Sequence, residues 1–146
     1  MTAKRYHRIR AQDLEAFQHG KDDYWFRPVV FGKNLYTYIA YVPPGGFMPP
    51  HGHEEDPYEL SLVMVQGTLD ILLDGDTFTA TSGDAVHVHP TVSLGVHNRS
   101  TAVASFVLTF NPPPRTSSLE AMRAWFRERG GGVKPAAEIE ALLSRR

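Results

Sequence analysis

Histidine residues gather in two short segments of this chain, and their spacing is typical of metal coordination. The first segment reads "PPHGHEEDPYEL" and carries His51 and His53 with one glycine between them. Residues i and i+2 of a β-strand point to the same face, so both imidazoles could bind one ion at about 2.0–2.2 Å. Because the chain has no cysteine, a metal here must take histidine, carboxylate or water ligands. Spacing alone leaves a second interpretation open, in which the pair belongs to a polar surface loop with solvated acidic neighbours.

The second segment reads "DAVHVHPTVSLGVHN" and carries three more histidines. His87 and His89 share one face of the expected strand. By strand parity Leu94, Val96 and Asn98 share one face of the chain, and His97 points to the other unless the chain is irregular around Gly95. An alternative places His87 and His89 on the outer face of their strand, with its valines pointing inward.

Short strands must position both segments, because the dominant hydrophobic period of the chain is two. The expected strands are residues 35–42, 59–65, 68–73, 84–89 and 102–110. Asp74-Gly75 suits a two-residue turn that needs positive φ and predicts a hairpin. Gly67 and Gly83 mark further reversals, so strands recur about every ten residues. This pattern predicts an all-β fold, an antiparallel sandwich or barrel.

The character of the chain changes at "NPPPRTSS", because three prolines in a row cannot join a sheet ladder. Ser117 and Glu120 can form a capping box that starts a helix from about residue 118 to residue 129. "GGG" ends that helix, and Pro135 suits the first turn of a second one. The tail from about residue 116 to residue 146 is therefore predicted to be a short helical appendage. One face of its first helix is apolar and should pack on the sheet or on a second subunit; it carries Leu119, Met122, Trp125 and Phe126.

Composition limits the possible partners. A chain of 146 residues predicts one domain, residues 1–146, with a core at about 35–112. Fifteen basic and sixteen acidic residues nearly cancel, so no overall field attracts nucleic acid or an anionic membrane. No apolar run reaches the roughly 20 residues of a membrane span, and the first residues do not read as a signal peptide. We expect a soluble cytoplasmic protein.

Two motifs resemble those of the cupin superfamily. In "GGFMPPHGH", Gly45 precedes the histidine pair by five intervening residues, as in the first cupin motif. Gly83 and Asn98 stand at the fifteen-position interval of the second motif. The resemblance covers about residues 35–112 and implies an antiparallel jelly roll with a metal in its mouth.

The sequence also departs from the cupin pattern at the other ligand positions. Glu59 is one residue out of register with the family's metal-binding Glu, so it reaches the metal only if a bulge or bend corrects the shift. Leu94 stands in the slot of the third metal histidine, and His89 fills a slot that usually holds proline. We expect His51 and His53 to bind the metal with two ligands from among His89, His97, His87 and Glu59.

A nitrogen-rich metal set is the first choice, made of His51, His53, His89 and His97, with His87 and Glu59 as candidate catalytic groups. Neutral imidazoles suit one divalent transition metal; zinc is favoured, and iron, nickel and copper stay open. If only two histidines bind, the cupin could be a metal-free binding cup.

The expected lining of the cup is apolar and aromatic. It comprises Tyr36, Tyr38, Tyr41, Phe47, Met48, Leu62, Met64, Phe106 and Leu108. The central strands carry no Arg or Lys, which argues against a phosphosugar or dicarboxylate and favours a neutral small molecule as the partner.

In size and general character the chain resembles the cupin-type aromatic polyketide cyclases of actinomycetes. That resemblance implies an aldol ring closure in which the metal acts as a Lewis acid. Two alternatives remain: a non-haem iron cupin dioxygenase and a non-enzymatic small-molecule binding cupin. A homodimer is expected, because cupins commonly pair through sheet edges and such edges need cover.

Overall fold

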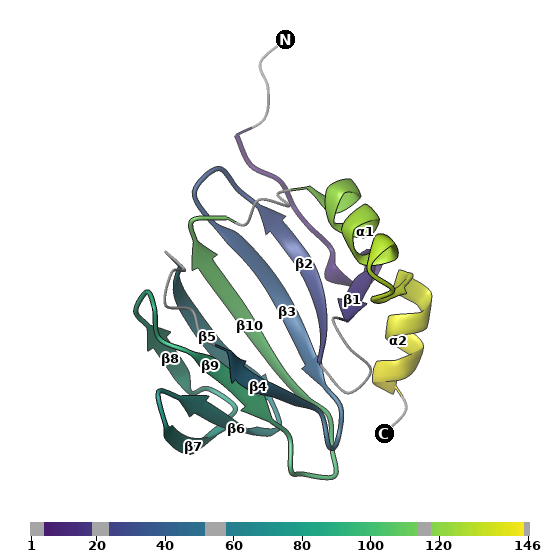
Figure 1. Cartoon of the computed structure of the whole chain (residues 1–146). Coiled ribbons are helices and arrows are strands. Elements are labelled where there is room, and N and C mark those ends of the chain that lie inside the picture. The colour runs from purple at the N-terminus through teal and green to yellow at the C-terminus, as the bar shows by residue number, and fades with distance from the viewer. Residues whose placement is uncertain (1–4, 19–23, 52–57, 114–117, 145–146) are drawn as a thin grey trace.

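Two antiparallel sheets form the body of the molecule (Figure 1). The computed structural model describes residues 5–18, 24–51, 58–113 and 118–144, with the backbone alone at residues 51 and 144. The larger sheet has the strand order β11-β1-β2-β3-β10-β5-β8, and the smaller has the order β4-β9-β6-β7. The strands are β1 (Ala16–Gln18), β2 (Trp25–Phe31), β3 (Tyr36–Val42), β4 (Phe47–His51), β5 (Glu59–Gln66), β6 (Thr68–Leu73), β7 (Asp76–Thr81), β8 (Ala85–Val88), β9 (Leu94–His97), β10 (Ala104–Asn111) and β11 (Gly132–Lys134).

The five strands expected from the hydrophobic period are all present, as β3, β5, β6, β8 and β10. The expected hairpin at Asp74-Gly75 is confirmed: it joins β6 to β7, and both residues have positive φ, 46° and 86°. The other strands were missed because their sequences hide the period. Strand β2 contains an arginine and a proline, and β11 consists of only three residues, one of them glycine.

Alternation along the strands separates the core from the surface. In β5, Leu60, Leu62 and Met64 point into the space between the sheets, while Ser61 and Val63 point outward. The same rule places Phe17 and Phe26 inside and Ala16 and Trp25 outside. The main core therefore lies between the two sheets and is rich in aromatic side chains.

The tail helices cover opposite faces of the larger sheet. Helix α1 (Leu119–Glu128) buries Met122 and Phe126 in the main core, where the Phe126 ring lies 5.2 Å from that of Phe17. Leu119 and Trp125 pack against the same core, so the predicted apolar face is confirmed. Helix α1 thus closes part of the inner face and is more than an appendage.

Helix α2 (Ala136–Ser144) packs on the outer face instead. Its fully buried Ile139 forms a separate small cluster with Ala16 and Trp25. Among the described residues, no helix is both long and apolar enough to cross a membrane.

The N-cap of α1 is one residue later than expected. Ser118 Oγ accepts a hydrogen bond from the Ala121 N–H at 3.2 Å. Ser117, the predicted cap, lies outside the described residues.

Candidate functional site

One end of the barrel carries a row of apolar side chains, three of them half-buried and the fourth, Tyr36, buried. In the larger sheet Phe31, Tyr36, Phe110 and Leu60 face one another across four neighbouring strands. The rings of Tyr36 and Phe110 lie 4.9 Å apart, and Tyr58 meets Phe110 edge-on at 5.1 Å. At the opposite end of the same strands Val42 and Ala104 are fully buried. The first end is thus the less tightly covered one.

The first histidine segment lies at this same end. The backbone of His51 closes β4 opposite Leu94, which in turn faces Leu73. A short link then leads from His51 to Glu59, where β5 begins in the other sheet. We call this the motif end of the barrel. The side chain of His51 and all of residues 52–57, including His53 and the acidic run, lie outside the described residues, so their role as metal ligands stays a prediction.

Glycine at position 95 lets β4 and β9 approach closely at the motif end. A Cβ atom on Gly95 would lie 2.5 Å from Pro50 N and 2.8 Å from Met48 O. The register between the two strands shifts over the same stretch, between Met48 and His51. Gly95 therefore sets the path of the strand that ends at His51.

Glu59 and His87, the expected catalytic pair, lie on the outer face of the larger sheet. Glu59 alternates with the inward-facing Leu60, so the one-residue shift from the cupin pattern is not corrected by a bulge. The Glu59 carboxylate instead meets His87 Nε2 at 2.5 Å, and both side chains are 56% exposed. The structure brings this pair together, but outside the barrel.

The other two histidines of the second segment also face outward. His89 is exposed beside His87, with ring centroids 4.7 Å apart. His97 lies on the outer face of the smaller sheet, where its ring meets Phe47 edge-on at 5.1 Å. Strand parity holds here, since Leu94 and Val96 fill the core. Among the described residues, no three His, Cys, Asp or Glu side chains are grouped so that they could hold a metal ion.

A charged network accompanies His97 on that outer face. The Arg99 Nε–H donates to Asp70 Oδ2 at 2.5 Å, and the Thr79 hydroxyl donates to Asp70 Oδ1 at 3.0 Å. The hydrogen bond from Arg99 is the main cause that lowers the pKa of Asp70. These charges lie on the outer surface of the smaller sheet and do not reach the interior.

Tyrosines supply polar groups inside the barrel, and sequence reasoning found only part of them. The hydroxyls of Tyr24 and Tyr38 lie 2.6 Å apart within the core. Tyr36 O–H donates to Met122 Sδ at 3.7 Å, and burial raises the pKa of Tyr36. Tyr24 and Tyr58 were missed, because Tyr24 precedes the residues that carry the resemblance and Tyr58 stands next to Glu59, itself a candidate ligand.

Charged side chains are absent from the described inner wall. Arg27 is buried, but it faces α2 on the outer side, where its Nη1 meets Glu140 Oε1 at 2.9 Å. Asp70 and Ser105 alternate with inward-facing residues and therefore also point outward. Asn98 is buried in a loop, where its side-chain N–H groups donate to the carbonyls of Val42 and Ala102.

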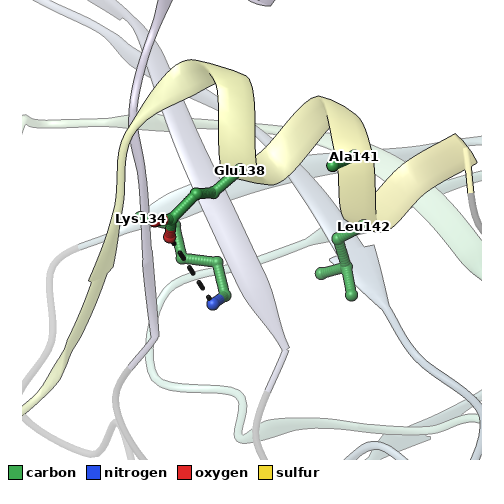
Figure 2. A pocket seen from close by; sticks show the side chains of 4 residues that line it. All are labelled: Lys134, Glu138, Ala141 and Leu142. Carbon is green, nitrogen blue, oxygen red and sulfur yellow. Dashed lines mark ion pairs between the residues drawn. The ribbon is translucent and has the colours of Figure 1, made fainter.

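A hollow lies away from the motif end, beside α2 (Figure 2). Its volume is about 340 Å³, and it is lined by Lys134, Glu138, Ala141 and Leu142. Lys134 Nζ and Glu138 Oε2 lie 3.9 Å apart across one side of it. This hollow is separate from both histidine segments.

Several solved structures resemble this chain in fold. The polyketide cyclase RemF from Streptomyces resistomycificus is 20% identical, with 74% of this chain and 82% of that one covered at a TM-score of 0.64. KdgF from Halomonas sp. is 19% identical, with 68% and 87% covered at a TM-score of 0.60. A predicted oxalate decarboxylase from Thermotoga maritima is 13% identical, with 72% and 98% covered at a TM-score of 0.63.

These identities establish the fold alone. A search of curated protein sequences finds no significant match. The family model described as Cupin domain matches residues 38–110, which lie within the range of about 35–112 covered by the resemblance. This chain belongs to the cupin family.

Proposed function

We propose that this cupin is an enzyme that binds a small, uncharged, mostly apolar carbonyl compound at the motif end and promotes ring closure of the polyketide cyclase type. The observation that carries the proposal is that the described residues of the inner wall bring no charge to it, while a row of apolar and mostly half-buried side chains lies at that end. A phosphate or carboxylate group would be desolvated there without a cation to offset its charge. An aromatic or aliphatic ketone would gain apolar contact instead.

Buried tyrosines can serve such a substrate as hydrogen-bond donors. The Tyr36 hydroxyl is protonated at neutral pH, as any phenol with a pKa of about 10 is, and it can donate a hydrogen bond. Burial raises the pKa of Tyr36 further. Its acceptor in the structure, the Met122 thioether, is a weak one, so a carbonyl oxygen would replace it favourably. A donor placed at a developing enolate oxygen lowers the barrier of an aldol closure.

The metal expected from the family is not accounted for by the described residues. Leu94 and Leu60 point into the barrel, whereas His87, His89, His97 and Glu59 point out of it. The described residues therefore do not complete the four-nitrogen set, and no step of the proposal passes through a metal. A role for His51 and His53 as ligands, and the preference for zinc, stay predictions that elemental analysis of tag-free protein checks.

A non-catalytic binding cup is the second candidate. The observation that favours it is Leu94, an apolar side chain in the slot of the family's third metal histidine. The fold-level likeness to RemF, a polyketide cyclase, supports the enzyme, because it shows that this architecture accommodates cyclase chemistry. None of the compared structures reported above is described as a dioxygenase. Iron found in tag-free protein would favour that alternative.

Ligand-induced stabilisation separates these candidates from charged-substrate cupins. We expect an aromatic β-diketone to raise the melting temperature, because a ligand at one hundred times its Kd adds about 2.7 kcal/mol to the free energy of unfolding. Its carboxylated analogue should have no effect. Leu60→Lys should abolish the shift, because it places a cation at the motif end. Ser61→Lys is the matched control, since Ser61 is the outward-facing neighbour. Equal shifts with both compounds would contradict the proposal.

Product analysis then decides between enzyme and binding cup. A linear poly-β-ketone incubated with the protein should give a ring-closed product of unchanged mass, or of one water less after dehydration. Tyr36→Phe should slow this reaction while keeping the thermal shift. If binding persists with no product, the chain is a binding cup.

A homodimer and a cytoplasmic location also stay proposals. Exposed valines on the outer face of the larger sheet, Val63 at 37% and Val65 at 48%, support the dimer. Sedimentation velocity would check the dimer.

A further inference from the structure

Three polar side chains form a cluster on the outer face at the free edge of the larger sheet. His87 lies in β8, the last strand of that sheet, and His89 follows one residue beyond its end. Ser61 faces His87 and Leu60 faces Val88, so continuing the register places Glu59 beside His89. Glu59, His87 and His89 are all exposed. This cluster takes no part in the proposed function.

The Glu59 carboxylate orients the ring of His87. Glu59 Oε2 lies 2.5 Å from His87 Nε2, and a carboxylate can only accept, so the neutral imidazole carries its proton on Nε2. Nδ1 of His87 is then left with its lone pair. A carboxylate that holds a histidine in this way is the arrangement found behind many metal-bound histidines, where it also makes the ligand more basic.

The spacing of the two rings suits a shared metal ion. With a metal–nitrogen distance of about 2.1 Å, each ring centroid lies about 3.2 Å from the ion, so two imidazoles at about 90–110° place their centroids about 4.5–5.2 Å apart. The centroids of His87 and His89 lie 4.7 Å apart. The separation of the two rings therefore allows both to reach one ion once a nitrogen of each ring turns toward it.

We propose that His87 and His89 chelate a divalent transition metal on the outer surface of β8, with Glu59 as the positioning residue for His87. Two imidazoles select copper or nickel ahead of magnesium or calcium, and copper gives the strongest binding in the first transition row. Water completes the coordination, because the described residues bring no third ligand to the site. The proposed site does not use His51 or His53.

Titration of tag-free, metal-free protein with copper tests the site. Copper binding should weaken about 10–100-fold in Glu59→Gln, because Glu59 only positions His87. It should weaken more in His87→Ala and in His89→Ala, each of which removes a ligand. His97→Ala is the matched control, an outward-facing histidine on the other sheet, and should change nothing. All four side chains lie on outer faces, so circular dichroism should show an unchanged fold.

The double variant His51→Ala, His53→Ala separates this site from the predicted one in the barrel. It should keep the copper affinity assigned to His87 and His89, and nuclear magnetic resonance should show paramagnetic broadening around Val88 in that variant. Copper binding that survives His89→Ala but is lost in the double variant would overturn the proposal. Loss of binding in His97→Ala would overturn it as well.

Discussion

One buried arginine on the outer side of the larger sheet depends on its neighbours to offset its charge. Arg27 is 1% exposed, and its Nε and Nη2 have no hydrogen-bond partner among the described residues. Its charge is offset by Glu140 of α2 at 2.9 Å, and its Nη1 also donates to the Tyr41 hydroxyl at 3.2 Å. A buried charge without a partner costs more than the pair itself contributes.

We therefore expect Glu140→Ala to destabilise the protein more than Arg27→Met does. Removing the carboxylate leaves a buried guanidinium uncompensated, which should cost about 1–3 kcal/mol because Glu140 is itself half-exposed. Replacing Arg27 with methionine removes the charge and keeps apolar volume. Urea unfolding midpoints measure both changes, with the exposed Glu128→Ala as control. A larger loss in Arg27→Met would show that the pair contributes net stability.

At the scale of elements, β4 depends on the absence of a side chain in its neighbour β9. Two residues of β4 are prolines, which carry no N–H to donate to β9. The pairing of β4 with β9 therefore depends on a close approach of the two backbones. Gly95 makes that approach possible.

Gly95→Ala should displace β4 and with it the backbone of His51. Backbone atoms stand within 2.8 Å of the new Cβ position and cannot yield as a flexible side chain could. We expect a loss of about 1–3 kcal/mol in stability and a reduced thermal shift with the β-diketone. Copper binding at His87 and His89 should be unaffected, because it belongs to the other sheet. Unchanged ligand binding would show that β4 does not shape the motif end.

Over the whole molecule, the two helices of the tail contribute unequally to the packing of the barrel. Helix α1 fills the main core beside Phe17, Phe26 and Tyr36, and β11 pairs with β1. Helix α2 adds the separate outer cluster around Ile139 and the Glu140 carboxylate that offsets Arg27.

Deleting residues 113–146 should therefore cost far more than deleting residues 136–146. The long deletion exposes aromatic side chains of the inner face, and we expect insoluble protein or a large drop in melting temperature. The short deletion removes α2 alone and should leave a folded, less stable barrel. Soluble yield and thermal melts measure both. Equal stability of the long deletion and the intact chain would rule out a structural role for α1.

Local signals in the sequence were sufficient for the cupin fold. Period-two strands, the Asp74-Gly75 turn and the two glycine-framed motifs act over short distances along the chain, so they can be recognised without tertiary information. Met122 and Phe126 were also predicted to lie on an apolar helix face that packs on the sheet or on a second subunit, because helical periodicity is local too. Which surface they would cover was not predictable, since it depends on packing between distant segments.

Only the tertiary structure decided which way the chemically capable residues point. Glu59, His87, His89 and His97 are candidates by residue type, but the pairing of each strand with its neighbours turns all four outward. A one-residue offset reverses the face of a strand side chain, and a sequence motif tolerates that offset while the sheet does not. The sequence by itself therefore determined the family and the fold, and it placed Tyr36 and Tyr38 in the interior. Long-range strand pairing decided that these histidines lie on the surface and that Tyr41, expected in the lining of the cup, packs beside Arg27 on the outer side.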